Sequence, residues 1–321
     1  MFPRPFSFRG PRRSAPARVT ALSGAADILL AAALFGTTGT ARAFAPSQAS
    51  PLAIGAARIV VGGLLLFCLA ARGPGLRLLM RKGAATWAAL ALGAGEVALY
   101  QVTFFAALAR TGVAAGTVVT IGTAPLFTGL FAWLAAGTRP ASRWMISTAA
   151  AVTGCAVLEI GTGSTGPQLA GIALALISGA SYAAYAVTAS RLITGGANDR
   201  AVIGVLFGGA ALLLTPVLFA GPATWVFTGR GLTVVAYLGV FATAVSYVRY
   251  ARGLRTVPVA VATTLGLAEP GVASLLGLAL LHEHLSPLSG AGLVLLGAGL
   301  VILGPLTPRR PSPLPEARPR N

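Results

Sequence analysis

Ten long apolar runs, separated by short segments that contain glycine, proline and arginine, make up most of the chain. Each run has close to the roughly 20 residues that an α-helix needs to cross the hydrocarbon core of a bilayer. The pattern therefore predicts ten transmembrane helices and leaves little sequence for a separate catalytic or nucleotide-binding domain. The expected helices lie at residues 24–41, 52–71, 86–107, 112–135, 143–160, 169–193, 201–220, 231–252, 258–280 and 287–305.

Arginine, threonine, proline and glycine residues of the first half recur in the second half at a spacing of 145 residues. Such internal similarity is typical of transporters built from two related bundles. Since each repeat would hold five spans, an odd number, the second copy is expected to run inverted relative to the first. The sequence thus predicts an all-α integral membrane protein with ten transmembrane helices as two inverted five-helix repeats, residues 21–161 and 168–305. The matched residues are Arg110 with Arg255, Thr111 with Thr256, Pro125 with Pro270, Gly154 with Gly299 and, with small shifts, Gly36 with Gly179 and Gly62-Gly63 with Gly208-Gly209.

The composition agrees with a protein that is surrounded by lipid. Of the 321 residues, 55% are hydrophobic and 10% are charged, whereas a soluble domain carries about 25% charged residues. The net charge of +17 does not indicate nucleic-acid binding, because the arginines are scattered between apolar runs and are not gathered on one folded face. The partner that the composition predicts is the lipid bilayer.

The basic residues predict how the chain is oriented. With the N-terminus in the cytoplasm, twenty lysines and arginines fall inside and three fall outside, which is the bias of the positive-inside rule. A multi-pass protein of the bacterial cytoplasmic membrane, with both termini cytoplasmic, is therefore expected. Residues 1–20 would form a basic cytoplasmic tail, and the Pro- and Arg-rich residues 306–321 a disordered one.

No cofactor, metal ion, ATP or enzymatic activity is expected. The run His282-Glu283-His284 has no evident further ligand for a metal. These are the only two histidines, so no nucleophile–base–acid set is apparent. The glycine-rich residues 161–166 lack the lysine of a P-loop. Cys68 and Cys155 fall at different depths, which makes a disulfide between them unexpected.

Two glutamates near the middle of their spans are the strongest candidates for a site. A charge inside the bilayer costs about 2.5–3.5 kcal/mol and persists where it faces a cavity, a partner or a pathway. Glu269 precedes Pro270, which bends a helix and frees a carbonyl group, so the two residues predict a combined hinge and site. Glu96 shares a helix face with Tyr100, four residues on, and lies near Gln101. For either glutamate the alternative is a structural hydrogen bond between helices.

Two further residues carry alternatives. Arg58 pairs either with a carboxylate of the transported solute or, structurally, with Glu159 or Glu96. Tyr182 is the first of several aromatic and hydroxyl-bearing residues in the second half. These residues either line a pocket for the solute or pack between helices. For Tyr247 and Tyr250, close to a helix end, the sequence favours an aromatic belt at the membrane interface.

Several short motifs resemble the ten-span drug/metabolite transporter superfamily, in its EamA-type branch with two EamA domains. They are Leu34-Phe-Gly-Thr-Thr-Gly-Thr in the first span, Ala57-Arg58-Ile-Val-Val-Gly-Gly in the second, Glu269-Pro270 in the ninth, and Leu281-His-Glu283-His-Leu-Ser before the tenth. The first repeat departs from the second: it has Ala124-Pro125 where the second has Glu269-Pro270, and Thr138 where the second has Glu283. A site made from both halves would therefore have different chemical groups on its two sides, as the binding of an asymmetric solute requires.

The resemblance implies a secondary transporter of a small metabolite, amino acid or drug-like solute, more often an exporter. Alternating access would rock the two repeats about a midplane site, with Pro125 and Pro270 as hinges. The hypothesis for coupling is that Glu269 or Glu96 exchanges a proton for the solute, since intramembrane carboxylates form proton relays in transporters. A lipid or lipid-linked precursor flippase on the same fold, a facilitative uptake permease, a membrane enzyme and a transport-dead scaffold are the alternatives.

Overall fold

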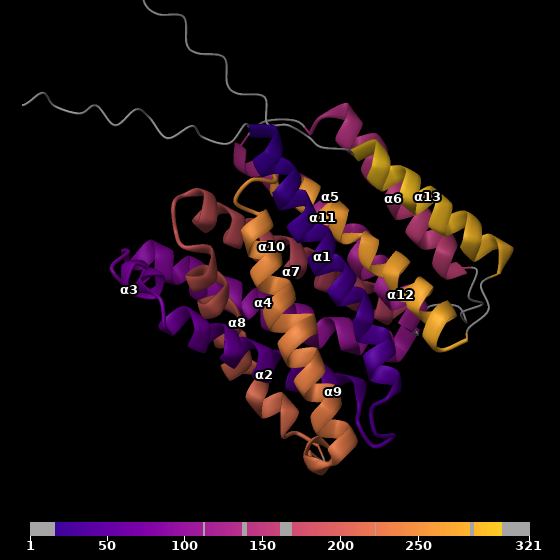
Figure 1. Ribbon diagram of the computed structural model, residues 1–321, viewed down its shortest axis with the longest axis horizontal. Helices are drawn as coiled ribbons and strands as arrows, with labels where there is room; N and C mark the ends of the chain where they lie inside the picture. Colours follow the sequence, from indigo (N-terminus) through magenta and orange to yellow (C-terminus); the bar gives the residue numbers. More distant parts are fainter. Residues whose placement is uncertain are drawn as a thin grey trace, which may run out of the picture.

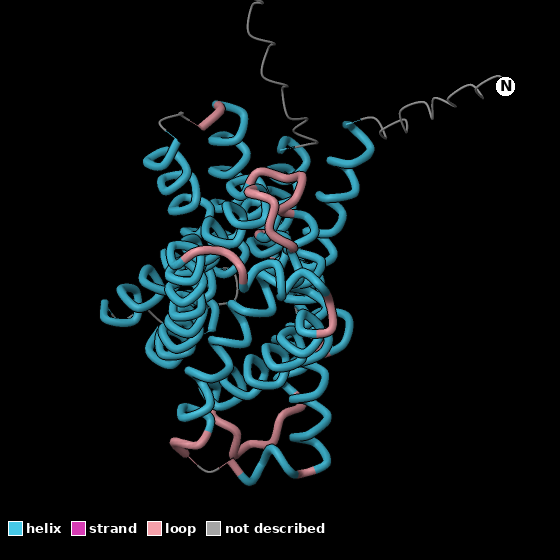
Figure 2. The backbone as a smooth tube through the Cα atoms, turned by 90° about the vertical axis from the view of Figure 1, so that its left-hand side faces the viewer, coloured by secondary structure: helices cyan, strands magenta, loops and turns pink. Residues whose placement is uncertain are grey.

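The computed structural model describes residues 17–111, 113–136, 140–160, 169–221, 223–282 and 286–303. Within these ranges every regular element is a helix, and short loops join the helices (Figures 1 and 2). The first half holds α1 (Ala17–Ala43), α2 (Pro51–Ala71), α3 (Pro74–Met80), α4 (Ala84–Thr111), α5 (Val113–Ala136) and α6 (Ser142–Ile160). The second half holds α7 (Leu169–Thr194), α8 (Asp199–Leu218), the 3₁₀-helix η1 (Thr224–Phe227), α9 (Gly229–Gly239), the π-helix η2 (Val240–Val245), α10 (Ser246–Gly253), α11 (Val259–Gly266), α12 (Ala268–Leu280) and α13 (Pro287–Leu303).

Most of the predicted spans are confirmed as membrane-capable helices. Eight segments of the described chain are long and apolar enough to cross a bilayer. Two of them are composite: α9, η2 and α10 together make the segment Gly229–Gly253, and α11 with α12 makes Val259–Leu280. The runs predicted at 143–160 and 287–305 fold as α6, 19 residues long, and α13, a shorter apolar helix of 17 residues. The chain is therefore a multi-pass membrane protein.

Helices from the two halves pack against each other throughout the bundle. The helices α2 and α8 pack along one another, and α6 and α13 form a second pair at one edge (Figure 1). Glycines allow these close approaches: a Cβ atom on Gly299 of α13 would lie 2.6 Å from the backbone nitrogen of Ala151 on α6. Small residues in such contacts replace the hydrophobic driving force that lipid removes.

Two helices are interrupted at the centre of the bundle. A single turn residue, Leu267, separates α11 from α12, three residues before Pro270. Proline has no backbone N–H, so the carbonyl of Gly266, four residues earlier, loses its helical donor. Between α9 and α10 the backbone widens into the π-helix η2, where the Thr243 hydroxyl donates to the Leu238 carbonyl at 2.8 Å. Such π-segments are frequent at functional sites.

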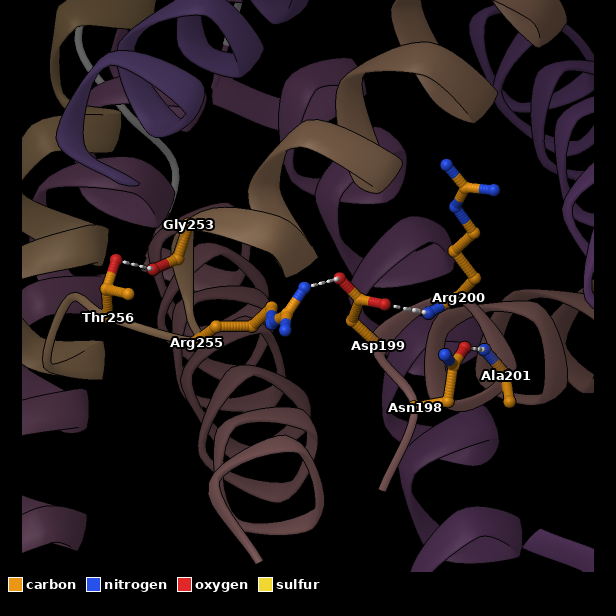
Figure 3. A network of polar contacts seen from close by, with 7 residues as sticks. All are labelled: Asn198, Asp199, Arg200, Ala201, Gly253, Arg255 and Thr256. Carbon is orange, nitrogen blue, oxygen red and sulfur yellow. Dashed lines mark hydrogen bonds and ion pairs between the residues drawn. The ribbon is translucent and has the colours of Figure 1, made fainter. Parts of the chain in front are cut away.

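Two ion pairs join helices towards one end of the bundle. This end, where α1 begins and α10 ends, is called the basic end. Arg249 of α10 bonds Asp27 of α1 with 3.0 Å between Nη1 and Oδ1. Arg255, just after α10, lies 3.8 Å from Asp199 at the start of α8 (Figure 3). The neighbouring Asn198 caps α8 by accepting the N–H of Ala201 (Figure 3). These contacts close the basic end around α10.

Candidate solute-binding site

A small cavity lies in the centre of the bundle and is lined by both halves of the chain. Its volume of about 20 Å³ is enough for about one water molecule. In this conformation the cavity therefore has no room for an organic solute. The lining residues are Tyr100 of α4, Thr120, Ile121 and Ala124 of α5, Tyr182 of α7, Thr263 and Gly266 of α11, and Glu269 of α12.

Each of the two matched prolines, Pro125 and Pro270, affects a residue that lines this cavity, the residue four positions before it in the sequence. Pro270 leaves the carbonyl of Gly266 without its helical donor, and Pro125, inside α5, does the same to Ile121. Gly266 and Ile121 both line the cavity. In transporters, carbonyl groups freed in interrupted helices serve to coordinate solutes or ions. The pair predicted as hinges thus lies next to the candidate site.

Glu269 is the only acidic residue among those that line the cavity. It sits in the first turn of α12, directly after the break that Pro270 explains. The positive charge of Arg58 acts on its carboxyl group. No ion pair within 4.0 Å joins the two side chains, since the ion pairs of the described residues are those at the basic end. A partly buried intramembrane carboxylate that lines a cavity and has no ionic partner among the described residues is suited to bind a solute or a proton.

Arg58 is buried, with 6% of its surface exposed, and its neighbours are mostly neutral. Nη1 donates to the Thr38 hydroxyl at 3.5 Å and Nη2 donates to Gln101 Oε1 at 3.4 Å, both long bonds. The Nε atom of Arg58 and the Nε2 atom of Gln101 have no hydrogen-bond partner among the described residues. The guanidinium group retains capacity for a further, anionic partner.

Arg58 forms no ion pair with Glu96, one of its proposed partners, among the described residues. Glu96 interacts with the hydroxyl of Thr188 on α7, and its buried Oε2 atom has no hydrogen-bond partner in the described part of the chain. It is not among the residues that line the cavity, although Tyr100, one turn further along α4, is. The side chain of Glu159, the other proposed partner, lies outside the described residues. The glutamates therefore occupy different positions: Glu269 at the cavity and Glu96 between α4 and α7.

Aromatic side chains continue from the cavity into the core. The ring centroids of Tyr100 and Tyr182 lie 5.4 Å apart, and those of Tyr182 and Tyr185 5.1 Å apart. Tyr247 extends the cluster, 6.4 Å from Tyr185. Offset and edge-to-face pairs of this kind fix ring orientation.

The interface belt expected for Tyr247 and Tyr250 is wrong. Their exposed fractions are 2% and 1%, so both point into the bundle. Their distance from a helix end indicated depth in the membrane but not the face of the helix on which they lie. Sequence reasoning also missed Thr38, Thr120 and Ile121, whose roles depend on contacts between helices.

The possible metal site and the two cysteines do not line this cavity, or they lie outside the described residues. Of the run at 282–284, only His282 is described, with a backbone φ of 54°. No group of three metal-ligating side chains occurs among the described residues. Cys68 is exposed and Cys155 is buried, and neither forms a disulfide.

The sequence resembles those of membrane transporters. The model of the EamA-like transporter family matches residues 22–160 and 169–304. The chain is 40% identical over 271 residues to the uncharacterized transporter YwfM of Bacillus subtilis, which covers 84% of this chain and 89% of YwfM. It is 29% identical over 268 residues to the uncharacterized inner membrane transporter YedA of Escherichia coli, covering 81% and 85%. One chain of known crystal structure has a TM-score of 0.74 at 22% identity, covering 89% of this chain and 98% of its own, which shows the shared fold.

Proposed function

Because the chain belongs to the EamA-like transporter family, we propose that it is a secondary transporter that exports a small organic solute by alternating access. The observation that carries the proposal is the central cavity, which both halves line. Glu269, the one carboxylate among its lining residues, and the nearby Arg58 have no ionic partner within the described parts of the chain. A site shared between two halves is what alternating access requires, since it changes sides when the halves move.

The proposal includes ten spans in two inverted repeats, residues 21–161 and 168–305. The helix packing supports it by its exchange symmetry. If α1, α2, α4, α5 and α6 correspond to α7, α8, α9–α10, α11–α12 and α13, then contacts should occur in exchanged pairs. The contact of α4 with α7 is matched by that of α10 with α1, and the contact of α5 with α7 by that of α12 with α1. The pairs α2–α8 and α6–α13 are their own counterparts.

Two glycines at matched positions give this symmetry atomic detail. A Cβ atom on Gly36 of α1 would lie 2.8 Å from the carbonyl oxygen of Glu269. A Cβ atom on Gly179 of α7 would lie 2.7 Å from the carbonyl oxygen of Thr120 and 3.6 Å from the nitrogen of Ala124. Ala124 is the repeat counterpart of Glu269. In each half, the first helix thus approaches the proline segment of the other half through a glycine.

The site residues have distinct proposed roles. Glu269 and Arg58 bind groups of opposite charge on the solute, and Tyr100, Gln101 and Tyr182 position it. Pro125 and Pro270 act as hinges beside the cavity. Glu269 is the first candidate for proton exchange, with Glu96 as a second carboxylate between α4 and α7. The basic end faces the cytoplasm with both termini, as the charge bias indicates.

Untargeted metabolite profiling of the culture medium tests the proposal. Cells that overproduce the wild-type chain are compared with cells that carry Glu96→Gln/Glu269→Gln at equal membrane abundance, and with empty vector. A metabolite that accumulates outside only with the wild type supports export through these carboxylates. If both strains differ equally from empty vector, the carboxylates are structural; if neither differs, export of cell metabolites is not the function.

Proton coupling has its own test once a solute is identified. Flux of that solute into liposomes that contain the purified chain is measured with and without an imposed pH gradient. Proton exchange predicts that the gradient accelerates flux in the wild type and has no effect on Glu269→Gln. A wild-type flux that ignores the gradient would leave facilitated exchange as the mechanism.

A further inference from the structure

A second, larger cavity lies between α1, α9 and α12 at the end of the bundle opposite the basic end. Its volume is about 410 Å³, within the roughly 300–1,000 Å³ typical of ligand pockets, whereas the central cavity measures about 20 Å³. The structure therefore has room for an organic molecule beside the candidate site but not in it. The lining residues are Thr37, Thr40 and Ala41 of α1, Phe44 in the turn that follows α1, Thr233, Val234 and Tyr237 of α9, and Leu276 and Leu280 of α12.

One face of α12 leads from Glu269 to the larger cavity. Leu276 and Leu280 follow Glu269 by seven and eleven residues and so lie on the same face of the helix. On α1, Thr40 follows Gly36 by four residues and lies on the same face, and Phe44 follows in the turn after the helix. The seam at which Gly36 meets the backbone of Glu269 therefore separates the two cavities.

The walls of this cavity are apolar in spite of their hydroxyl groups. The Thr37 hydroxyl donates to the Leu34 carbonyl at 2.7 Å, and the Thr233 hydroxyl donates to the Gly229 carbonyl at 2.8 Å. Both donors are thus used within their own helices, and the side chains present methyl groups. With Leu276 and Phe44 beside them, these walls favour hydrocarbon.

We propose that this cavity holds the apolar body of the transported solute, which makes the substrate class amphipathic: a hydrocarbon or aromatic body with one charged end. The inference rests on the proposed transport function and narrows its substrate. The charged residues Glu269 and Arg58 lie at the inner end of the path, so the solute's charged group points inward. A membrane phospholipid that inserted a tail from the bilayer would instead bring its hydrocarbon end to the charged residues, which is unfavourable.

Photolabelling of the purified full-length chain in lipid nanodiscs tests the proposal. The probes are eight-carbon amphiphiles with a terminal diazirine, one a carboxylate and one an ammonium, and a phospholipid with the same diazirine in its tail. Leu276→Trp narrows the cavity. Leu275→Trp, at a neighbouring position that is 50% exposed on the outside of the bundle, is the matched control. Labelling is located by mass spectrometry and normalised to lipid-facing Leu212 on α8, which is 70% exposed.

At least one single-chain probe is expected to label residues 37–44 or 276–280 in the wild type and in Leu275→Trp. Leu276→Trp should reduce this labelling by about tenfold, and Leu276→Ala, which enlarges the cavity, should preserve or increase it. The proposal is overturned if Leu276→Trp labels like the wild type, or if only the phospholipid loses labelling there. Export of the solute found by medium profiling separates a failure of this inference from a failure of the proposed transport function. If export survives Leu276→Trp, the larger cavity does not hold the solute but the transport function stands. If labelling is as expected but the wild type exports nothing, the transport function is overturned.

Discussion

Arg58 of α2 and Glu269 of α12 bring opposite charges to the centre of the protein from different halves without forming an ion pair with each other. Arg58 is held by the neutral side chains of Thr38 and Gln101, at 3.5 and 3.4 Å. Its burial is costly unless a partner compensates the charge. A solute with a charged group would supply that compensation during part of the transport cycle.

Replacing Arg58 tests whether its charge is used in transport. Arg58→Gln removes the charge and leaves a shorter, neutral amide that no longer reaches Thr38 and Gln101 from the same backbone position. We expect export to fall by about tenfold or more, because hydrogen bonds to charged groups contribute about 1.5–3 kcal/mol. Thermal unfolding of the purified variant should change little or rise, since a buried charge is lost. The exposed Arg77→Gln on α3 is the control; equal export by Arg58→Gln and Arg77→Gln would show that the Arg58 charge is not used.

The glycine contacts predict matched effects in the two halves. Gly36→Ala and Gly179→Ala each place a methyl group against a backbone carbonyl and force two helices apart, which costs about 1–3 kcal/mol for overpacking. Both variants should lose export and thermal stability to a similar degree. Gly39→Ala, one turn along α1 with open space at its Cβ position, should be neutral in both measurements. If Gly36→Ala behaves like Gly39→Ala, the seam between α1 and α12 is looser than the structure indicates.

The chain's sequence predicted the helices well because lipid imposes one simple requirement, an apolar run of sufficient length. It also located the break before Pro270, since proline acts on its own helix. It gave no signal for the π-helix at 240–245, which contains neither glycine nor proline. The partners of Arg58 were also missed, because they depend on how α1, α2 and α4 rotate against one another.

The ion pair between Asp27 and Arg249 should contribute to closing the basic end. Asp27→Arg places two positive charges together and is expected to change the export rate by at most about fivefold, since partly exposed pairs contribute about 0.2–1 kcal/mol. The swapped variant Asp27→Arg/Arg249→Asp should restore export towards the wild-type rate. Arg200→Gln, beside Asp199 but without an ion pair among the described residues, is the control (Figure 3). If the swapped variant is as impaired as Asp27→Arg, this ion pair does not contribute to closing the basic end.

Pro270→Ala should raise the thermal stability of the protein and slow its export of the solute. The alanine N–H restores a donor for the Gly266 carbonyl and so favours a continuous α11–α12 helix. Thermal stability is expected to rise while export falls several-fold. Pro216→Ala, which replaces the proline inside α8, is the control. Leu212, the residue four positions earlier whose carbonyl lacks a helical donor, has a side chain that faces away from the bundle, so export should not change. Unaltered export by Pro270→Ala would mean that the break is not a hinge.

Cysteine accessibility at the central cavity tests alternating access most directly. Ala124→Cys, in a chain with Cys68→Ser and Cys155→Ala, lines the cavity and is 3% exposed. A membrane-impermeant maleimide is applied to intact cells and to inverted vesicles, with Ala186→Cys, fully buried outside the cavity, as the control. We expect Ala124→Cys to be modified from both sides of the membrane and Ala186→Cys from neither. Modification of Ala124→Cys from one side only, or from neither, would contradict a shared site that the two halves expose in turn.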